Sequence, residues 1–143
     1  MKLIITIMAL TFTAASFACA NFAGNFTCTV QDDNYTYSLG IEQNGAVFRI
    51  TDDEGTDEFT ADGQRRAIPN DTNLRNAFYT GSCSGNTVTL LMTGDIFDDE
   101  TGQVFPFKAN MIHALPTRNH VVQTTTTELL GQTVVTTTHC RRN

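Results

Sequence analysis

The side chains that could do chemistry in this chain are few, and their spacing matches no catalytic or metal-binding motif. The three histidines, His113, His120 and His139, show neither the His-x-x-x-His nor the Glu-x-x-His spacing that places two ligands on one metal ion. No serine lies in the Gly-x-Ser-x-Gly turn that exposes a nucleophile. We therefore expect a protein that is not an enzyme and that holds no metal ion or cofactor.

Two acidic segments, residues 52–58 and 95–100, offer the carboxylate oxygens that Ca²⁺ prefers. Neither matches the D-x-D-x-D-G register of a calcium-binding loop, so we interpret both as solvated turns. The chain has 15 acidic and 9 basic residues, which gives a net charge of −6. Such a chain lacks the positive surface that attracts phosphate backbones or anionic membranes, so we expect no nucleic-acid partner.

The first twenty residues have the pattern of a secretory signal peptide. Lys2 precedes an uncharged run over residues 3–17, and Ala18-Cys19-Ala20 forms a small-x-small cleavage site. We predict a signal peptide over residues 1–20 and a single domain over residues 21–143. The product would be secreted or periplasmic, without a transmembrane segment, and we expect a monomer. The alternative is cleavage after Ala18, which would leave Cys19 to carry a lipid anchor.

Cleavage after Ala20 removes Cys19 and leaves three cysteines, hence one disulfide and one odd thiol in an oxidising compartment. We favour a Cys28–Cys140 disulfide, because the first and last strands are neighbours in a closed meander. Cys28–Cys83 and Cys83–Cys140 are the alternatives.

The sequence pattern predicts β-strands along the whole domain, including the segments that contain these cysteines. Residues 35–42 alternate apolar and polar side chains and end at the turn dipeptide Asn44-Gly45, which predicts a hairpin with residues 46–51. A second hairpin dipeptide, Asp62-Gly63, separates two shorter strands. The later strands are expected over residues 76–83, 86–93, 104–115, 121–129 and 133–141.

Hairpin-length links leave no room for crossover helices, so sequential antiparallel pairing is expected. We predict an all-β fold, an antiparallel up-and-down β-barrel of about 8–10 strands, because closure protects the edges of so many strands. A β-sandwich is the alternative. The positions expected to face inward are Phe26, Leu39, Ile41, Phe48, Ile50, Phe78, Val88, Leu90, Met92, Phe105, Phe107 and Met111.

Large, flexible side chains among these inward positions suggest a cavity for a small apolar molecule. His113 shares the apolar stripe of residues 105–115. It is either a polar anchor inside that cavity or a partly buried histidine with one hydrogen bond. The candidate ligand-binding residues are Phe48, Phe78, Met92, Phe105, Phe107, Met111 and His113.

The two ends of the predicted domain resemble the calycins, the superfamily of the lipocalins and the fatty-acid-binding proteins. Calycins begin their first strand with Gly-x-Trp and carry, near the end of the last strand, an Arg that packs over the Trp. Here Gly24-Asn25-Phe26 and Arg141 or Arg142 stand at those places, with Phe26 in place of the Trp. The resemblance implies a barrel that binds a small apolar ligand. Residues 139–143 lack the Tyr of the pair that holds a fatty-acid carboxylate.

Two functions therefore compete. One is a lipocalin-like binding protein for a small hydrophobic molecule. The other is a non-enzymatic interaction protein of the cell envelope, such as an inhibitor or an adhesive module, with a filled barrel. A void of roughly 300 Å³ or more would favour the first function.

Overall fold

The structure, a computed structural model, describes residues 19–143. In this range the chain forms ten β-strands. The described residues include no helix long and apolar enough to cross a membrane. The predicted signal peptide lies outside the described part of the chain except for its last two residues, Cys19 and Ala20.

The strand bounds lie close to those expected from the alternating pattern. The strands are β1 (Gly24–Val30), β2 (Thr36–Asn44), β3 (Val47–Thr51), β4 (Thr56–Thr60), β5 (Arg65–Ala67), β6 (Leu74–Ser84), β7 (Thr87–Phe97), β8 (Val104–Thr117), β9 (His120–Leu129) and β10 (Gln132–Arg142).

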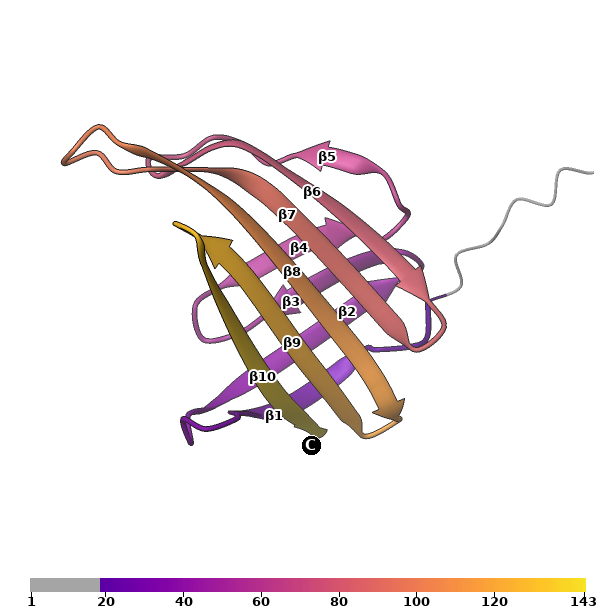
Figure 1. Cartoon of the computed structure of the whole chain (residues 1–143). Coiled ribbons are helices and arrows are strands. Elements are labelled where there is room, and N and C mark those ends of the chain that lie inside the picture. Colours follow the sequence, from indigo (N-terminus) through magenta and orange to yellow (C-terminus); the bar gives the residue numbers. More distant parts are fainter. Residues whose placement is uncertain (1–18) are drawn as a thin grey trace, which may run out of the picture.

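The strands form one antiparallel sheet in the order β4-β3-β2-β1-β10-β9-β8-β7-β6-β5. The sheet curls strongly into an open half-barrel, so that β1 to β4 cross behind β6 to β9 (Figure 1). The predicted all-β, up-and-down antiparallel fold is confirmed. The first and last strands pair as expected, and the sheet breaks instead between β4 and β5.

The break between β4 and β5 has a local cause. Asp62 accepts a hydrogen bond from the backbone N–H of Gln64 and binds both terminal nitrogens of Arg66 at 2.7 Å. The N–H of Gly63 donates to the carbonyl oxygen of Gly81 on β6, at 2.7 Å. These contacts turn the chain toward β6, with which β5 pairs. The hairpin predicted at Asp62-Gly63 is therefore wrong.

Two disulfides join residues that lie far apart in the sequence, with separations of 64 and 112 residues. Cys28 and Cys140 are register partners on β1 and β10, with Cα atoms 3.9 Å apart, and their predicted bond is confirmed. Cys83, expected to be an odd thiol, is instead bonded to Cys19. That expectation was wrong because the segment before β1 packs beside the β6–β7 turn, where the N–H of Ala20 donates to the carbonyl of Gly85.

Aromatic rings from β3, β4 and the segment before β1 pack inside the curled sheet, against side chains of β7. The rings of Phe48 and Phe59 stack at 5.3 Å between centroids, and Phe22 meets Phe48 edge-on at 6.0 Å. Val88 and Leu90 of β7 belong to the same buried cluster. Because strands from both ends of the sheet order contribute side chains to this core, its packing stabilises the curled sheet.

Most positions predicted to face inward do so. The buried ones are Phe26, Leu39, Ile41, Phe48, Val88 and Leu90. Ile50, Met92 and Met111 are partly buried and pack against this core. Phe105 and Phe107, near the start of β8, are also only partly buried.

Phe78 is the exception, because a β-bulge in β6 shifts which residues of the strand point inward. The register between β6 and β7 shifts between Arg75 and Phe78, where Asn76 has a φ of +51°. Ala77 then faces inward at 2% exposure. Phe78 lies on the outer face, with the guanidinium of Arg65 3.8 Å from its ring centroid. The inward prediction for Phe78 was therefore wrong.

Candidate functional site

The interior of the half-barrel contains one buried polar side chain from the predicted site. His113 is 5% exposed, and its Nδ1 atom has no hydrogen-bond partner among the described residues. Burial lowers the pKa of His113 from 6.5 to about 4, so the imidazole is neutral at neutral pH. Its neighbours around a small cavity are Phe22, Ile41, Phe48, Ile50, Phe59 and Val88.

This cavity has a volume of about 10 Å³. A single water molecule needs roughly 10–15 Å³ of such volume, and pockets for small molecules are usually about 300–1,000 Å³. The cavity beside His113 is therefore too small for an organic ligand in this conformation.

The predicted ligand-binding residues do not converge on one place. Phe48 and His113 border the small cavity. Met92 and Met111 touch the edge of the core, while Phe105 and Phe107 lie near the start of β8. Phe78 lies on the outer face, as described above.

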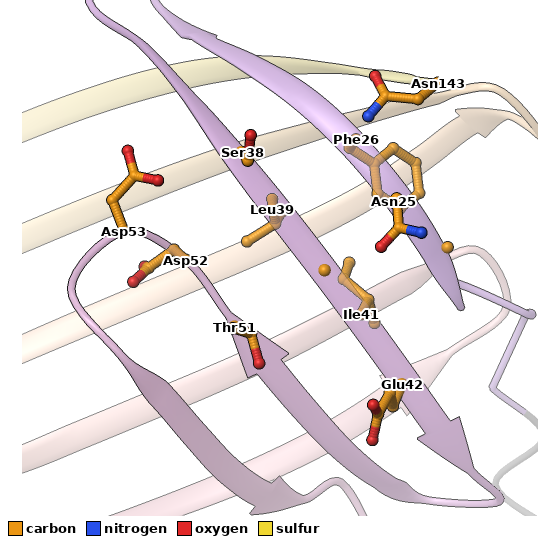
Figure 2. Close-up of a pocket in the computed structure, with 12 residues that line it drawn as sticks. Asn25, Phe26, Ser38, Leu39, Ile41, Glu42, Thr51, Asp52, Asp53 and Asn143 are labelled. Carbon is orange, nitrogen blue, oxygen red and sulfur yellow. The ribbon is translucent and has the colours of Figure 1, made fainter.

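A much larger hollow lies on the outer face of β1, β2 and β3, and we call it the β1–β3 groove. It has a volume of about 820 Å³ and is open to solvent. Figure 2 shows the residues that line it. The polar side chains on its surface belong to Asn25, Ser38, Glu42, Thr51, Asp52, Asp53 and Asn143. The interpretation of residues 52–58 as a solvated turn holds only up to Gly55, because β4 begins at Thr56. The sequence pattern did not identify Ser38, Glu42, Thr51 or Asn143 as site residues.

The groove is hollow because Gly40 lies at its centre. A Cβ atom at Gly40 would stand 3.6 Å from Oδ1 of Asn25 and 3.8 Å from the carbonyl of Thr51. The missing side chain therefore leaves open the space between β1 and β3. The alternation of residues 35–42 marks Gly40 as outward-facing, but sequence alone does not show which residues flank it across the sheet.

The last residue of the chain closes one side of the groove. Thr27 donates its hydroxyl to Oδ1 of Asn143 at 2.7 Å, and the N–H of Asn143 donates to the carbonyl of Asn25 at 3.0 Å. The C-terminus is therefore held against β1. Figure 2 shows Asn143 beside Asn25, with Asp52 and Asp53 across β2 on the turn that follows β3.

The charged side chains that line the groove are all negative. Its lining residues include three carboxylates, Glu42, Asp52 and Asp53, and neither lysine nor arginine. Oδ1 of Asp52 accepts hydrogen bonds from the backbone N–H groups of Glu54 and Gly55, at 2.8 and 3.1 Å, which orders the turn. Glu42 lies 3.8 Å from Arg49, but both side chains are exposed, so this ion pair neutralises little. The groove is chemically suited to a cationic partner.

Residues 19–143 contain no group of three or more histidine, cysteine or acidic side chains placed to hold a metal ion. His120 and His139 form a pair on β9 and β10, with Nε2 and Nδ1 3.3 Å apart.

At the end of the half-barrel next to β1, Arg142 packs over the ring of Phe26. Its guanidinium lies 4.8 Å from the ring centroid of Phe26. Arg142 also donates to the carbonyls of Ala23 and Arg118, at 2.7 and 3.0 Å. A side chain at Gly24 would collide with this guanidinium. The contact joins the entry to β1 with the end of β10.

No protein-family model matches the chain, and no curated protein sequence matches it significantly.

Proposed function

We propose that this protein is a non-enzymatic interaction protein of an oxidising, extracytoplasmic compartment, and that its β1–β3 groove contacts a partner with a basic segment. The observation that carries the proposal is the groove itself, an open hollow of about 820 Å³ with carboxylates and no cationic side chain in its lining. The two disulfides support the compartment, because such bonds persist where the surroundings are oxidising.

The packed interior supports an outer site over an inner one. The cavity beside His113 holds about 10 Å³, so an internal ligand would have to displace the rings of Phe48 and Phe59. Opening that cluster would cost packing energy that a partner bound at the outer groove does not have to offset.

The charge of the chain favours the same kind of partner. The net charge of −6 attracts cationic surfaces over a long range, and the groove concentrates three carboxylates at one place. Complementary charge of this kind speeds association and selects among partners more than it adds affinity. Binding should therefore weaken with added salt.

The test uses a fluorescent oligolysine peptide as the probe, at about 0.01 M and about 0.15 M ionic strength, where the screening length falls from ~30 to ~8 Å. The variant Glu42→Gln/Asp52→Asn/Asp53→Asn removes the groove charge. The asparagine at position 52 keeps the oxygen that orders the turn.

The matched control is Asp98→Asn/Asp99→Asn/Glu100→Gln, which makes the same change in net charge on the β7–β8 loop. Asp98 also accepts hydrogen bonds from two backbone N–H groups, so the two variants perturb similar turns. We expect the groove variant to lose at least about threefold more affinity than the control, since each of the three exposed charge pairs contributes ~0.2–1 kcal/mol. Equal losses in both variants would contradict the proposal.

A second candidate function is the binding of a small apolar molecule in the manner of a lipocalin. The observation in its favour is that Met92, Met111 and Phe107 are only partly buried along the inner face of β7 and β8. Native mass spectrometry of protein purified gently from its own source tests it. A co-purified lipid-like mass would favour this function over the outer groove.

A further inference from the structure

The chain just before β1 is fastened to the folded domain by several bonds. Cys19 is joined to Cys83 by a disulfide, with their Cα atoms 5.2 Å apart. The N–H of Ala20 donates to the carbonyl of Gly85 at 3.1 Å. The side-chain amide of Gln43 donates to the carbonyl of Ala20 at 3.0 Å.

This segment also takes part in the core. Cys19 and Ala20 pack against the buried cluster, and Phe22 is one of its fully buried rings. The side-chain oxygen of Gln43 accepts a hydrogen bond from the N–H of Phe22 at 2.8 Å. The same amide group therefore binds the segment at both Ala20 and Phe22. Residues 19–22 are therefore part of the folded domain.

We propose that the mature protein begins at Cys19, and that the signal peptidase of the secretory route cuts between Ala18 and Cys19. This inference rests on the predicted signal peptide and is independent of the proposed function. Ser16 and Ala18 are small residues at the third and first positions before that bond, as the small-x-small rule requires. Water adds across the peptide bond, leaving a carboxylate on Ala18 and a free amino group on Cys19.

Cleavage after Ala20 satisfies the same rule but removes both residues that the domain binds. It would leave Cys83 without its partner and would delete the Ala20 contacts to Gly85 and Gln43. The folded structure therefore distinguishes two cleavage sites that the sequence pattern does not.

The Cys19 sulfur can form either a disulfide or a thioether to a lipid, but not both. In forming the disulfide, the thiols of Cys19 and Cys83 lose two electrons and two protons to the disulfide of a thiol–disulfide exchange protein, which becomes a dithiol. A lipid anchor would instead require a thioether on the same sulfur atom. Disulfide formation at Cys19 therefore competes directly with lipid attachment.

The test is to export the full chain with its own signal into an oxidising periplasm and to measure the intact mass without reduction. We expect the mass of residues 19–143 less four hydrogens, and a cross-linked Cys19–Cys83 peptide after digestion. Thiol alkylation of the denatured wild-type protein should add no label. A mass that begins at Asn21, with an alkylated Cys83, would overturn the proposal.

The variant Cys83→Ser separates the two cleavage sites even if it folds poorly, because the label is counted on denatured protein. It leaves the residues around both candidate bonds unchanged. If the chain begins at Cys19, this variant gains one alkylated thiol, located on Cys19. If the chain begins at Asn21, it has none. A lipid-sized mass increase on Cys19 in the wild-type protein would equally contradict the proposal.

Discussion

The inner and outer faces of β1 and β2 differ in nearly every property, although the same two strands make both. On the inner face, Phe26 and Leu39 are 0% and 3% exposed and belong to the packed core. On the outer face, Asn25 and Glu42 are exposed, and Gly40 between the flanking strands leaves a hollow. A strand with period-two alternation can thus supply stability with one face and leave the other free for recognition.

The strongest way to test this contrast is to truncate one side chain on each face. Phe26→Ala should lower the free energy of unfolding by about 3–5 kcal/mol, because it removes a fully buried ring and leaves a cavity. The neighbouring change Asn25→Ala, on the outer face, should lower it by no more than about 0.5 kcal/mol. Urea denaturation of both variants measures the difference, and similar losses would show that the faces are not distinct.

The next largest effect concerns the bond that joins β1 to β10. Replacing both Cys28 and Cys140 by serine should cost about 2–5 kcal/mol, because the bond spans 112 residues and its loss frees the unfolded chain. The groove should keep its shape in the folded fraction, since Asn143 and Asn25 remain hydrogen-bonded on the outer face. Loss of oligolysine binding by the folded double variant would instead link the outer face to the inner one.

Acid should destabilise the inner face through His113. The pKa of its imidazole is about 4 in the folded protein and near 6.5 when the chain is unfolded. Between these values the unfolded chain binds a proton that the folded protein does not. Stability from this group is therefore complete above pH 6.5, falls as the pH drops toward 4, and loses about 3 kcal/mol over that window.

Chemical denaturation of the wild-type protein and of His113→Leu, at a series of pH values, measures this contribution. The leucine variant should lack the part of the pH dependence between pH 6.5 and 4, while the carboxylates titrate alike in both proteins. Parallel curves would mean that His113 takes up its proton over the same pH range in the folded and the unfolded protein, so that burial does not lower its pKa.

Arg142 should have a smaller effect at the end of the barrel next to β1. Arg142→Ala removes hydrogen bonds to the carbonyls of Ala23 and Arg118 and the contact with the Phe26 ring. We expect a loss of about 1–2 kcal/mol, because the hydrogen bond to Ala23 is partly buried whereas the carbonyl of Arg118 is exposed and can bind water instead. Arg141→Ala, on the exposed neighbouring residue, is the control and should change stability by less than about 0.5 kcal/mol.

The smallest change in stability should come from filling the groove. Gly40→Val places a branched side chain between Asn25 and Thr51, where a Cβ meets its neighbours at ordinary contact distances. Because valine favours extended backbone, stability should change by no more than about 0.5 kcal/mol, with a gain as the expected direction. Oligolysine binding should nevertheless fall. Unchanged binding at unchanged stability would place the contact elsewhere.

Local pattern predicted the strands and the Cys28–Cys140 bond because both depend on alternation and on sequential pairing. It did not predict how far burial extends along each strand. Val134 and Val135 lie on opposite faces of β10, yet they are 59% and 61% exposed, because no other part of the described chain covers this end of the strand. Alternation therefore identifies two faces of a strand but not whether another layer covers either of them.

Three other features depend on contacts between distant residues. The outward turn of Phe78 follows from the bulge at Asn76, where Ala77 packs closely against Gly94. The Cys19–Cys83 bond depends on where the segment before β1 lies. The groove likewise needs β1, β3 and the C-terminus to meet around Gly40. No single segment of sequence contains these relations.

Under the proposed function, recognition takes place on the outer face while the inner face remains packed. NMR spectra of the protein labelled at backbone amides and methionine methyls, titrated with oligolysine, test it most directly. We predict chemical-shift changes at the amides of Asn25, Gly40 and Asp53, with the methyls of Met92 and Met111 unchanged. The opposite result, in which the methyls shift on adding a fatty-acid or retinoid probe while oligolysine leaves the groove amides unmoved, would contradict the claim.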